Sequence, residues 1–134
     1  MTKKEMQRRY DQENRLVALG GITRKEADTL RRCSRTLSRW GELECGDGND
    51  RASWAIERDE ATGKPFFVTY PYEGKTRRRA IPDREAGALR RIRAIVEPKG
   101  LFFYHQTDPR GAAVYVSDEP LTAENYPSRG IPVW

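Results

Sequence analysis

Residues 101–117 read LFFYHQTDPRGAAVYVS, and this stretch decides the fold class. Two runs rich in aromatic and β-branched residues, 101–107 and 112–117, have the composition of β-strands. Asp108-Pro109-Arg110-Gly111 lies between them and suits a type I turn, in which Asp bonds backbone amides and Pro presets the second position. We therefore predict a β-hairpin here.

The residues before this hairpin predict a second hairpin and a helix. Residues 54–58 are a short run of mixed apolar and polar residues, and a turn that contains Gly63 joins them to the returning strand at 65–70. Residues 75–81 can add a short edge strand whose charges discourage further pairing. The helix follows Pro82, with Asp83 as its expected cap, and ends before Pro98 and Gly100. Its apolar stripe is Ala86, Leu89, Ile92 and Val96.

A longer helix is expected nearer the N-terminus, over residues 24–40. Thr23 and Glu26 have the spacing of a capping box, Ile22 can act as a hydrophobic staple, and Gly41 suits the C-terminal cap. Helical spacing puts the apolar and small residues on one face and the arginines on the other. The first face holds Ala27, Leu30, Cys33, Ser34, Leu37 and Trp40, and the second holds Arg24, Arg31, Arg32, Arg35 and Arg39.

These elements predict an α+β fold. We expect a single domain over residues 23–134 with a mainly antiparallel sheet of two hairpins, an intervening helix and helices on one face. Residues 1–22 form a polar N-terminal segment that ends at Gly20-Gly21 and becomes helical only if it docks. Residues 118–134 are expected to be coil, with Ile131, Val133 and Trp134 able to dock the chain end on the core.

Length and composition narrow the class of protein. The chain has 134 residues, of which 37% are hydrophobic and 34% are charged, so one domain with a modest core is expected. No segment has the roughly 20 apolar residues of a membrane span, and the first residues lack the apolar stretch of a signal peptide. We expect a cytoplasmic protein with no membrane partner.

The charges occur in blocks. Residues 1–40 carry a net charge of +6, residues 41–74 carry −5, and residues 75–97 carry +5. Basic blocks attract phosphate backbones or acidic protein faces. The candidate binding residues are Arg31, Arg35 and Arg39, stacked at i, i+4 spacing, and next Arg77, Arg78, Arg79 and Arg90 from the second basic block. Aromatic residues Trp54, Tyr70 and Tyr72 could stack on the bases of a single strand.

Catalytic and metal-binding signals are weak. Cys33, Cys45 and His105 are too few for a structural zinc site or a disulfide framework, and no cofactor is expected. Cys33 falls on the apolar helix face, where a buried thiol is typical, and Cys45 falls in a polar loop. His105 and Asp108 could form the centre of a small enzyme such as a nuclease, but turn chemistry explains Asp108 without one.

Three stretches resemble small uncharacterised proteins encoded in bacteriophages and prophages of proteobacteria. They are residues 30–37 (LRRCSRTL), 81–85 (IPDRE) and 104–111 (YHQTDPRG). The resemblance implies a compact, basic phage accessory protein of the host cytoplasm, and many such proteins bind and block host machinery, CRISPR and other defence systems included. We therefore expect a non-enzymatic inhibitor or modulator of a host protein or ribonucleoprotein complex. The alternative is a protein that binds DNA or RNA directly through its arginine-rich faces.

Overall fold

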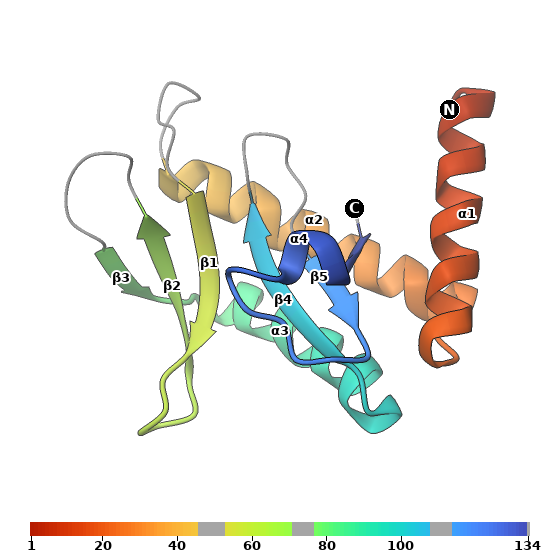
Figure 1. Ribbon diagram of the computed structural model, residues 1–134. Helices are drawn as coiled ribbons and strands as arrows, with labels where there is room; N and C mark the ends of the chain where they lie inside the picture. The colour runs from red at the N-terminus through yellow and green to blue at the C-terminus, as the bar shows by residue number, and fades with distance from the viewer. Residues whose placement is uncertain (46–52, 71–76, 108–113, 134) are drawn as a thin grey trace.

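The computed structural model describes residues 1–45, 53–70, 77–107 and 114–133 (Figure 1). For residues 41–45, 53–55, 67, 69–70, 77 and 106–107 we consider the backbone only. The elements in chain order are α1 (Lys3–Gly20), α2 (Arg24–Cys45), β1 (Ser53–Arg58), β2 (Pro65–Tyr70), β3 (Arg77–Ala80), α3 (Asp83–Val96), the 3₁₀ turn η1 (Glu97–Lys99), β4 (Phe102–Thr107), β5 (Val114–Ser117), α4 (Tyr126–Arg129) and β6 (Ile131–Val133).

The strands form one antiparallel sheet in the order β3-β2-β1-β4-β5-β6. Both predicted hairpins are present, as β1–β2 and β4–β5, and β3 is the predicted edge strand. In the first hairpin Gly63 adopts a φ of 70°, and the Asp59 carboxylate accepts a hydrogen bond of 2.8 Å from the Ala61 amide. The turn predicted at 108–111 lies outside the described residues.

Helices α2 and α3 lie against one face of the sheet, behind it in Figure 1. The two helices run antiparallel, because Lys99 after α3 pairs with Glu26 in the first turn of α2 at 3.2 Å. The side chains between helices and sheet form the hydrophobic core, which also takes in α1 and β6. Its fully buried members include Leu16, Ile22, Leu30, Leu37, Ile92, Val96, Val114, Val116 and Val133. The α+β class predicted from the sequence is confirmed.

The opposite face of the sheet carries an aromatic cluster. Tyr104 and Tyr115 are register partners on β4 and β5, so their side chains share this face. Tyr126 of α4 stacks on Tyr104 at a centroid distance of 5.1 Å and meets Tyr115 edge-on at 4.8 Å. Helix α4 therefore covers part of the face that α2 and α3 leave open.

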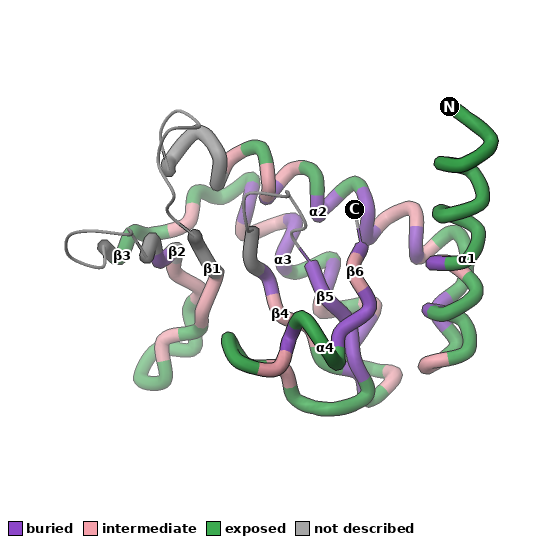
Figure 2. The backbone as a smooth tube through the Cα atoms, turned by 45° about the horizontal axis from the view of Figure 1, so that its top comes forward, coloured by how far each residue is buried: buried purple, intermediate pink, exposed green. Residues whose placement is uncertain are grey.

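The N-terminal segment was predicted to become helical only if it docks, and it forms helix α1, which docks on the core through Leu16. Leu16 of α1 is fully buried in the core, whereas most of the N-terminal half of α1 is exposed (Figure 2). The predicted capping box at the start of α2 is confirmed, since the Thr23 hydroxyl accepts from the Glu26 amide at 3.1 Å and the Glu26 carboxylate accepts from the Thr23 amide at 3.0 Å. Ile22, the expected staple, is fully buried. The proposed division of the chain after residue 22 stays a prediction.

Two predicted helix ends are wrong. Helix α2 continues through Gly41 to Cys45, so Gly41 is not its cap and Cys45 does not lie in a loop. A glycine inside a helix costs only about 1 kcal/mol, and the Glu-Leu-Glu that follows favours helix. At α3 the N-cap is Pro82 and no side chain caps the helix, so Asp83 is the first helical residue instead.

The C-terminal segment is ordered where coil was predicted. Residues 126–129 form α4 and residues 131–133 form β6, which pairs with β5. Ile131 and Val133 are buried in the core, as their expected docking requires, while Trp134 lies outside the described residues. The Ser34 hydroxyl on α2 donates to the Val133 carbonyl at 2.8 Å, and the Gln12 amide on α1 donates to the Pro132 carbonyl. These contacts come from distant parts of the chain, so local sequence could not indicate the strand.

Within the described ranges, the chain has no helix that combines the length and the apolar character needed to cross a membrane.

Candidate functional site

The exposed faces of α2 and α3 form a basic hollow. Arg35 and Arg39, both predicted binding residues, are exposed on α2, and Arg32 is exposed beside them. Arg84 reaches the same place from the first turn of α3. The hollow has a volume of about 470 Å³, and the residues lining it are Arg32, Arg35, Thr36, Arg39, Trp40, Arg84 and Glu85. We call this set the α2–α3 hollow.

Packing of the two helices explains this arrangement. Leu30 and Leu37 of α2 and Leu89 and Ile92 of α3 point into the core. The arginines of the hollow, Arg32, Arg35, Arg39 and Arg84, lie on the exposed faces of the two helices. Because the helices run antiparallel, the C-terminal half of α2 lies beside the N-terminus of α3. Arg84 is therefore brought to the hollow from a segment 45 residues beyond Arg39.

The hollow has an excess of positive charge. In the described parts of the chain, Arg32, Arg35, Arg39 and Arg84 form no ion pair with a carboxylate. Among the side chains that the structure describes, one carboxylate lines the hollow, that of Glu85, which is 7% exposed. The first turn of α3 carries the carboxylates of Asp83 and Glu85, which offset the positive end of the helix dipole, so the excess of charge comes from the guanidinium groups. Such a surface favours phosphate or carboxylate groups.

Arg31 does not belong to this exposed surface, and the expected row of three exposed arginines is wrong. Its side chain is 5% exposed, and its guanidinium pairs with Glu13 of α1 at 2.8 Å and with Asp28 at 2.7 Å. A hydrogen bond from Arg9 lowers the pKa of Asp28, which keeps this carboxylate charged. The i, i+4 spacing is correct, but α1 packs over this turn of α2. Arg31 therefore joins the two helices.

The remaining predicted arginines lie apart from the hollow. On edge strand β3, Arg78 and Arg79 are exposed, and they are register partners of Val68 and Phe67, so they point to opposite faces as the alternation predicted. The Arg78 guanidinium lies over the Phe66 ring at 3.9 Å. Arg90 is exposed on α3 but does not line the hollow, and the side chain of Arg77 lies outside the description.

Five of the described residues that line the hollow were not among the predicted binding residues: Arg32, Thr36, Trp40, Arg84 and Glu85. Arg32 had been placed on the arginine face of its helix. Arg84 was grouped with the second basic block, Trp40 with the apolar helix face, and Glu85 with neither. The sequence did contain a signal for Arg84. It follows Pro82-Asp83 directly, and side chains in the first turn of a helix lie beside its positive end, where anions bind. Only the antiparallel packing of α2 and α3 links that turn to Arg39.

His105 lies inside the protein. It is 1% exposed on β4, and burial lowers its pKa to about 3, so the ring is neutral at pH 7. Burial also raises the pKa of the Cys33 thiol, in agreement with its interpretation as a small core residue. Asp108 and Tyr72 lie outside the described residues, as do the side chains of Trp54 and Tyr70. The enzyme hypothesis and the stacking hypothesis for these residues stay predictions.

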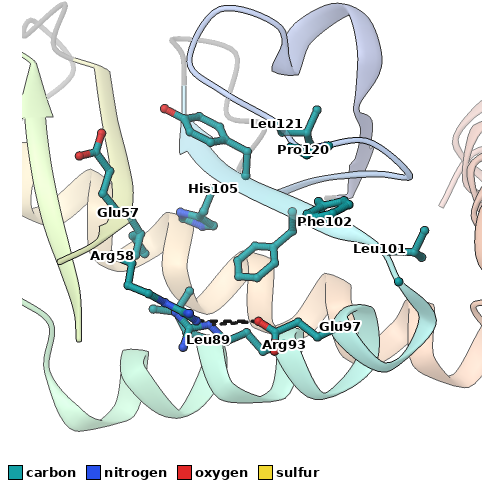
Figure 3. A pocket seen from close by; sticks show the side chains of 14 residues that line it. Glu57, Arg58, Leu89, Arg93, Glu97, Leu101, Phe102, His105, Pro120 and Leu121 are labelled. Carbon is teal, nitrogen blue, oxygen red and sulfur yellow. Dashed lines mark ion pairs between the residues drawn. The ribbon is translucent and has the colours of Figure 1, made fainter. Parts of the chain in front are cut away.

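A second cavity opens where β1 and β4 separate (Figure 3). Its volume is about 550 Å³, and it is bounded by the end of β1, the first half of β4, one side of α3 and the segment after β5. Most of its wall is apolar, and four charged side chains of the described residues reach it: Glu57, Arg58, Arg93 and Glu97. We call it the fork pocket.

Comparison of the chain with models of protein families, with curated proteins and with solved structures finds no match in any of the three.

Proposed function

We propose that this protein is a non-enzymatic binding protein of the host cytoplasm, and that its α2–α3 hollow binds a single strand of nucleic acid. One observation carries the proposal. Four arginines from two helices, Arg32, Arg35, Arg39 and Arg84, line one hollow without an ion pair to any carboxylate of the described chain. Guanidinium groups in this state are available to phosphate oxygens.

The chemistry of the hollow favours a nucleic acid over an acidic protein face. Arginine binds phosphate with two parallel hydrogen bonds, and several arginines along a groove follow the phosphates of a backbone. Trp40 lines the same hollow, and aromatic side chains are the residues on which bases stack. The Glu85 carboxylate can accept hydrogen bonds from a base amino group. A volume of about 470 Å³ is in the range of pockets that hold a group the size of a nucleotide.

The test is fluorescence anisotropy with labelled single-stranded DNA and RNA across a series of NaCl concentrations. Each phosphate contact contributes about −0.7 to the slope of log K against log salt, so three or four contacts predict a slope of about −2 to −3. The variant Arg35→Glu/Arg39→Glu is expected to weaken binding by more than about tenfold.

The matched control is Lys4→Glu/Arg15→Glu, which makes the same change in net charge at exposed positions of α1. It is expected to change affinity only slightly, because its residues lie outside the hollow. Equal losses of affinity in the two double variants would mean that binding depends on the net charge of the protein and not on the hollow. Binding without salt dependence would contradict the proposal.

A second candidate function is contact with a host protein in a nucleic-acid-handling or defence complex, as the resemblance to phage proteins implies. The observation in its favour is an apolar stripe on α1, where Met6, Tyr10 and Val17 are 55%, 49% and 46% exposed. Exposed apolar stripes are typical of protein interfaces.

This candidate predicts that the tagged protein retains a host protein and that Met6→Glu/Tyr10→Glu releases it. The same variant should leave nucleic-acid affinity unchanged, since α1 does not line the hollow. If the variant at Arg35 and Arg39 releases the host protein instead, the contact runs through the hollow.

A further inference from the structure

The fork pocket exists because β1 and β4 pair over only three residues. Their register runs from Trp54↔Thr107 to Ile56↔His105 and then stops, although both strands continue. Beyond this point β1 turns away with β2 and β4 stays with β5. Arg58 and Phe102 therefore stand at the open ends of the two strands, with the cavity between them (Figure 3).

The wall of the pocket is mainly apolar. Leu89 contributes from α3, Phe102 and Phe103 from β4, and Pro120 and Leu121 from the segment after β5. In Figure 3, Pro120 and Leu121 lie across the pocket from Arg93. A cavity with one apolar end and one charged end suits an amphipathic small molecule, and about 550 Å³ is within the range of ligand pockets.

At the charged end of the pocket, one buried donor has no hydrogen-bond acceptor among the described residues. This donor is the Arg93 Nε atom, which is buried and has no hydrogen-bond partner in the part of the chain that the structure describes. One carboxylate oxygen of Glu97 lies 3.9 Å from this Nε and 3.8 Å from a terminal nitrogen of Arg58, and both distances are too long for a hydrogen bond. A buried donor without an acceptor is costly, so an acceptor from a ligand would stabilise this arrangement.

Two guanidinium groups also lie close to each other here. Burial lowers the pKa of Arg93, the positive charge of Arg58 lowers it further, and the Glu97 carboxylate opposes part of this shift. The Glu97 carboxylate relieves part of this repulsion, and an anion that approaches both guanidinium groups more closely would relieve more of it. Glu57 and Glu97 line the same pocket and repel a dianion more than a monoanion.

We propose that the fork pocket binds a small carboxylic acid with an apolar tail, its carboxylate between Arg58 and Arg93 and its tail against the wall formed by Phe102 and Leu121. A carboxylate is planar, carries one charge and matches the guanidinium fork, so it fits this site better than a phosphate. The site is independent of the α2–α3 hollow, because Arg93 and Arg84 point to opposite sides of α3.

The test uses 4-phenylbutanoate and its neutral amide, 4-phenylbutanamide, as probes of the full chain. Isothermal titration calorimetry is expected to give at least about tenfold tighter binding for the acid. In ¹H–¹⁵N spectra the acid should shift the Arg93 Nε resonance and the backbone amides of Phe103 and Tyr104, all of which border the pocket. Equal affinity for acid and amide, no binding of the acid at millimolar concentration, or shifts confined to other residues would each overturn the proposal.

Two variants and one control distinguish the contribution of the Arg93 charge from that of the apolar volume of the pocket. Arg93→Met keeps an apolar stem and should lose about tenfold in affinity for the acid while affinity for the amide stays unchanged. Leu121→Trp fills the apolar end and should abolish binding of both probes, and it decides the question if Arg93→Met does not fold. Arg15→Met, at an exposed position of α1, should bind as the unmodified protein does. Unchanged affinity for the acid in both pocket variants would overturn the proposal.

Discussion

At the scale of single residues, burial decides what His105 contributes. Its folded-state pKa of about 3 lies below its ordinary value of 6.5, so between these pH values the unfolded chain binds a proton that the folded chain does not. The stability due to the neutral ring is present above pH 6.5 and is lost as the pH falls. Urea unfolding at pH 7 and pH 4.5 should show that the unmodified protein loses about 2 to 3 kcal/mol more than His105→Gln. Identical pH profiles would contradict the buried, neutral histidine.

Arg31 is a buried charged residue whose ion pairs contribute to stability. The Arg31 guanidinium pairs with Glu13 and Asp28, and its side chain is 5% exposed. Arg31→Met removes this buried cation, and within the described chain the two carboxylates keep only their ion pairs with Arg9 and Arg24. We expect a loss of about 3 kcal/mol in the free energy of unfolding, measured with urea. Arg32→Met, one residue further along α2 and exposed, should change it by less than about 0.5 kcal/mol. A similar effect of both variants would mean that Arg31 does not join α1 to α2.

At the scale of elements, β6 tests whether the C-terminal segment belongs to the core. Val133 is fully buried beside β5, so Val133→Asp places a carboxylate in the core and should cost more than about 3 kcal/mol. Ser128→Asp on exposed α4 should stay within about 0.5 kcal/mol. Urea unfolding measures both. If the C-terminal segment were coil, as the sequence predicted, the two variants would have the same free energy of unfolding, and that result would contradict the packing of β6.

Gly130, directly before β6, lies where the backbone passes too close to its neighbours for any side chain. A Cβ atom at Gly130 would lie 2.7 Å from the Cβ atom of Tyr115 and 2.8 Å from the Tyr126 carbonyl oxygen. The chain between α4 and β6 can therefore pass over β5 only without a side chain at this position. Gly130 thus allows β6 to pair with β5, although the composition of residues 118–134 is typical of coil.

At the scale of the whole molecule, α1 decides whether the chain unfolds as one unit. Leu16 is buried in the core, so Leu16→Ala should cost about 3 kcal/mol, whereas Met6→Ala on the exposed side of α1 should change stability by less than about 0.5 kcal/mol. Urea unfolding followed by circular dichroism and by tryptophan fluorescence should give coincident transitions. An earlier loss of helix signal would instead support residues 1–22 as a separate segment.

Local sequence was sufficient to predict the two hairpins, the edge strand, the capping box of α2 and the apolar faces of α2 and α3. These features depend on strand alternation, helical spacing and turn residues, which are properties of neighbouring positions. The burial of Arg31, the order of β6, the meeting of Arg39 with Arg84 and the gap between β1 and β4 could not be predicted. Each of these depends on contacts between residues far apart in the chain, and only the packing of complete elements brings such residues together.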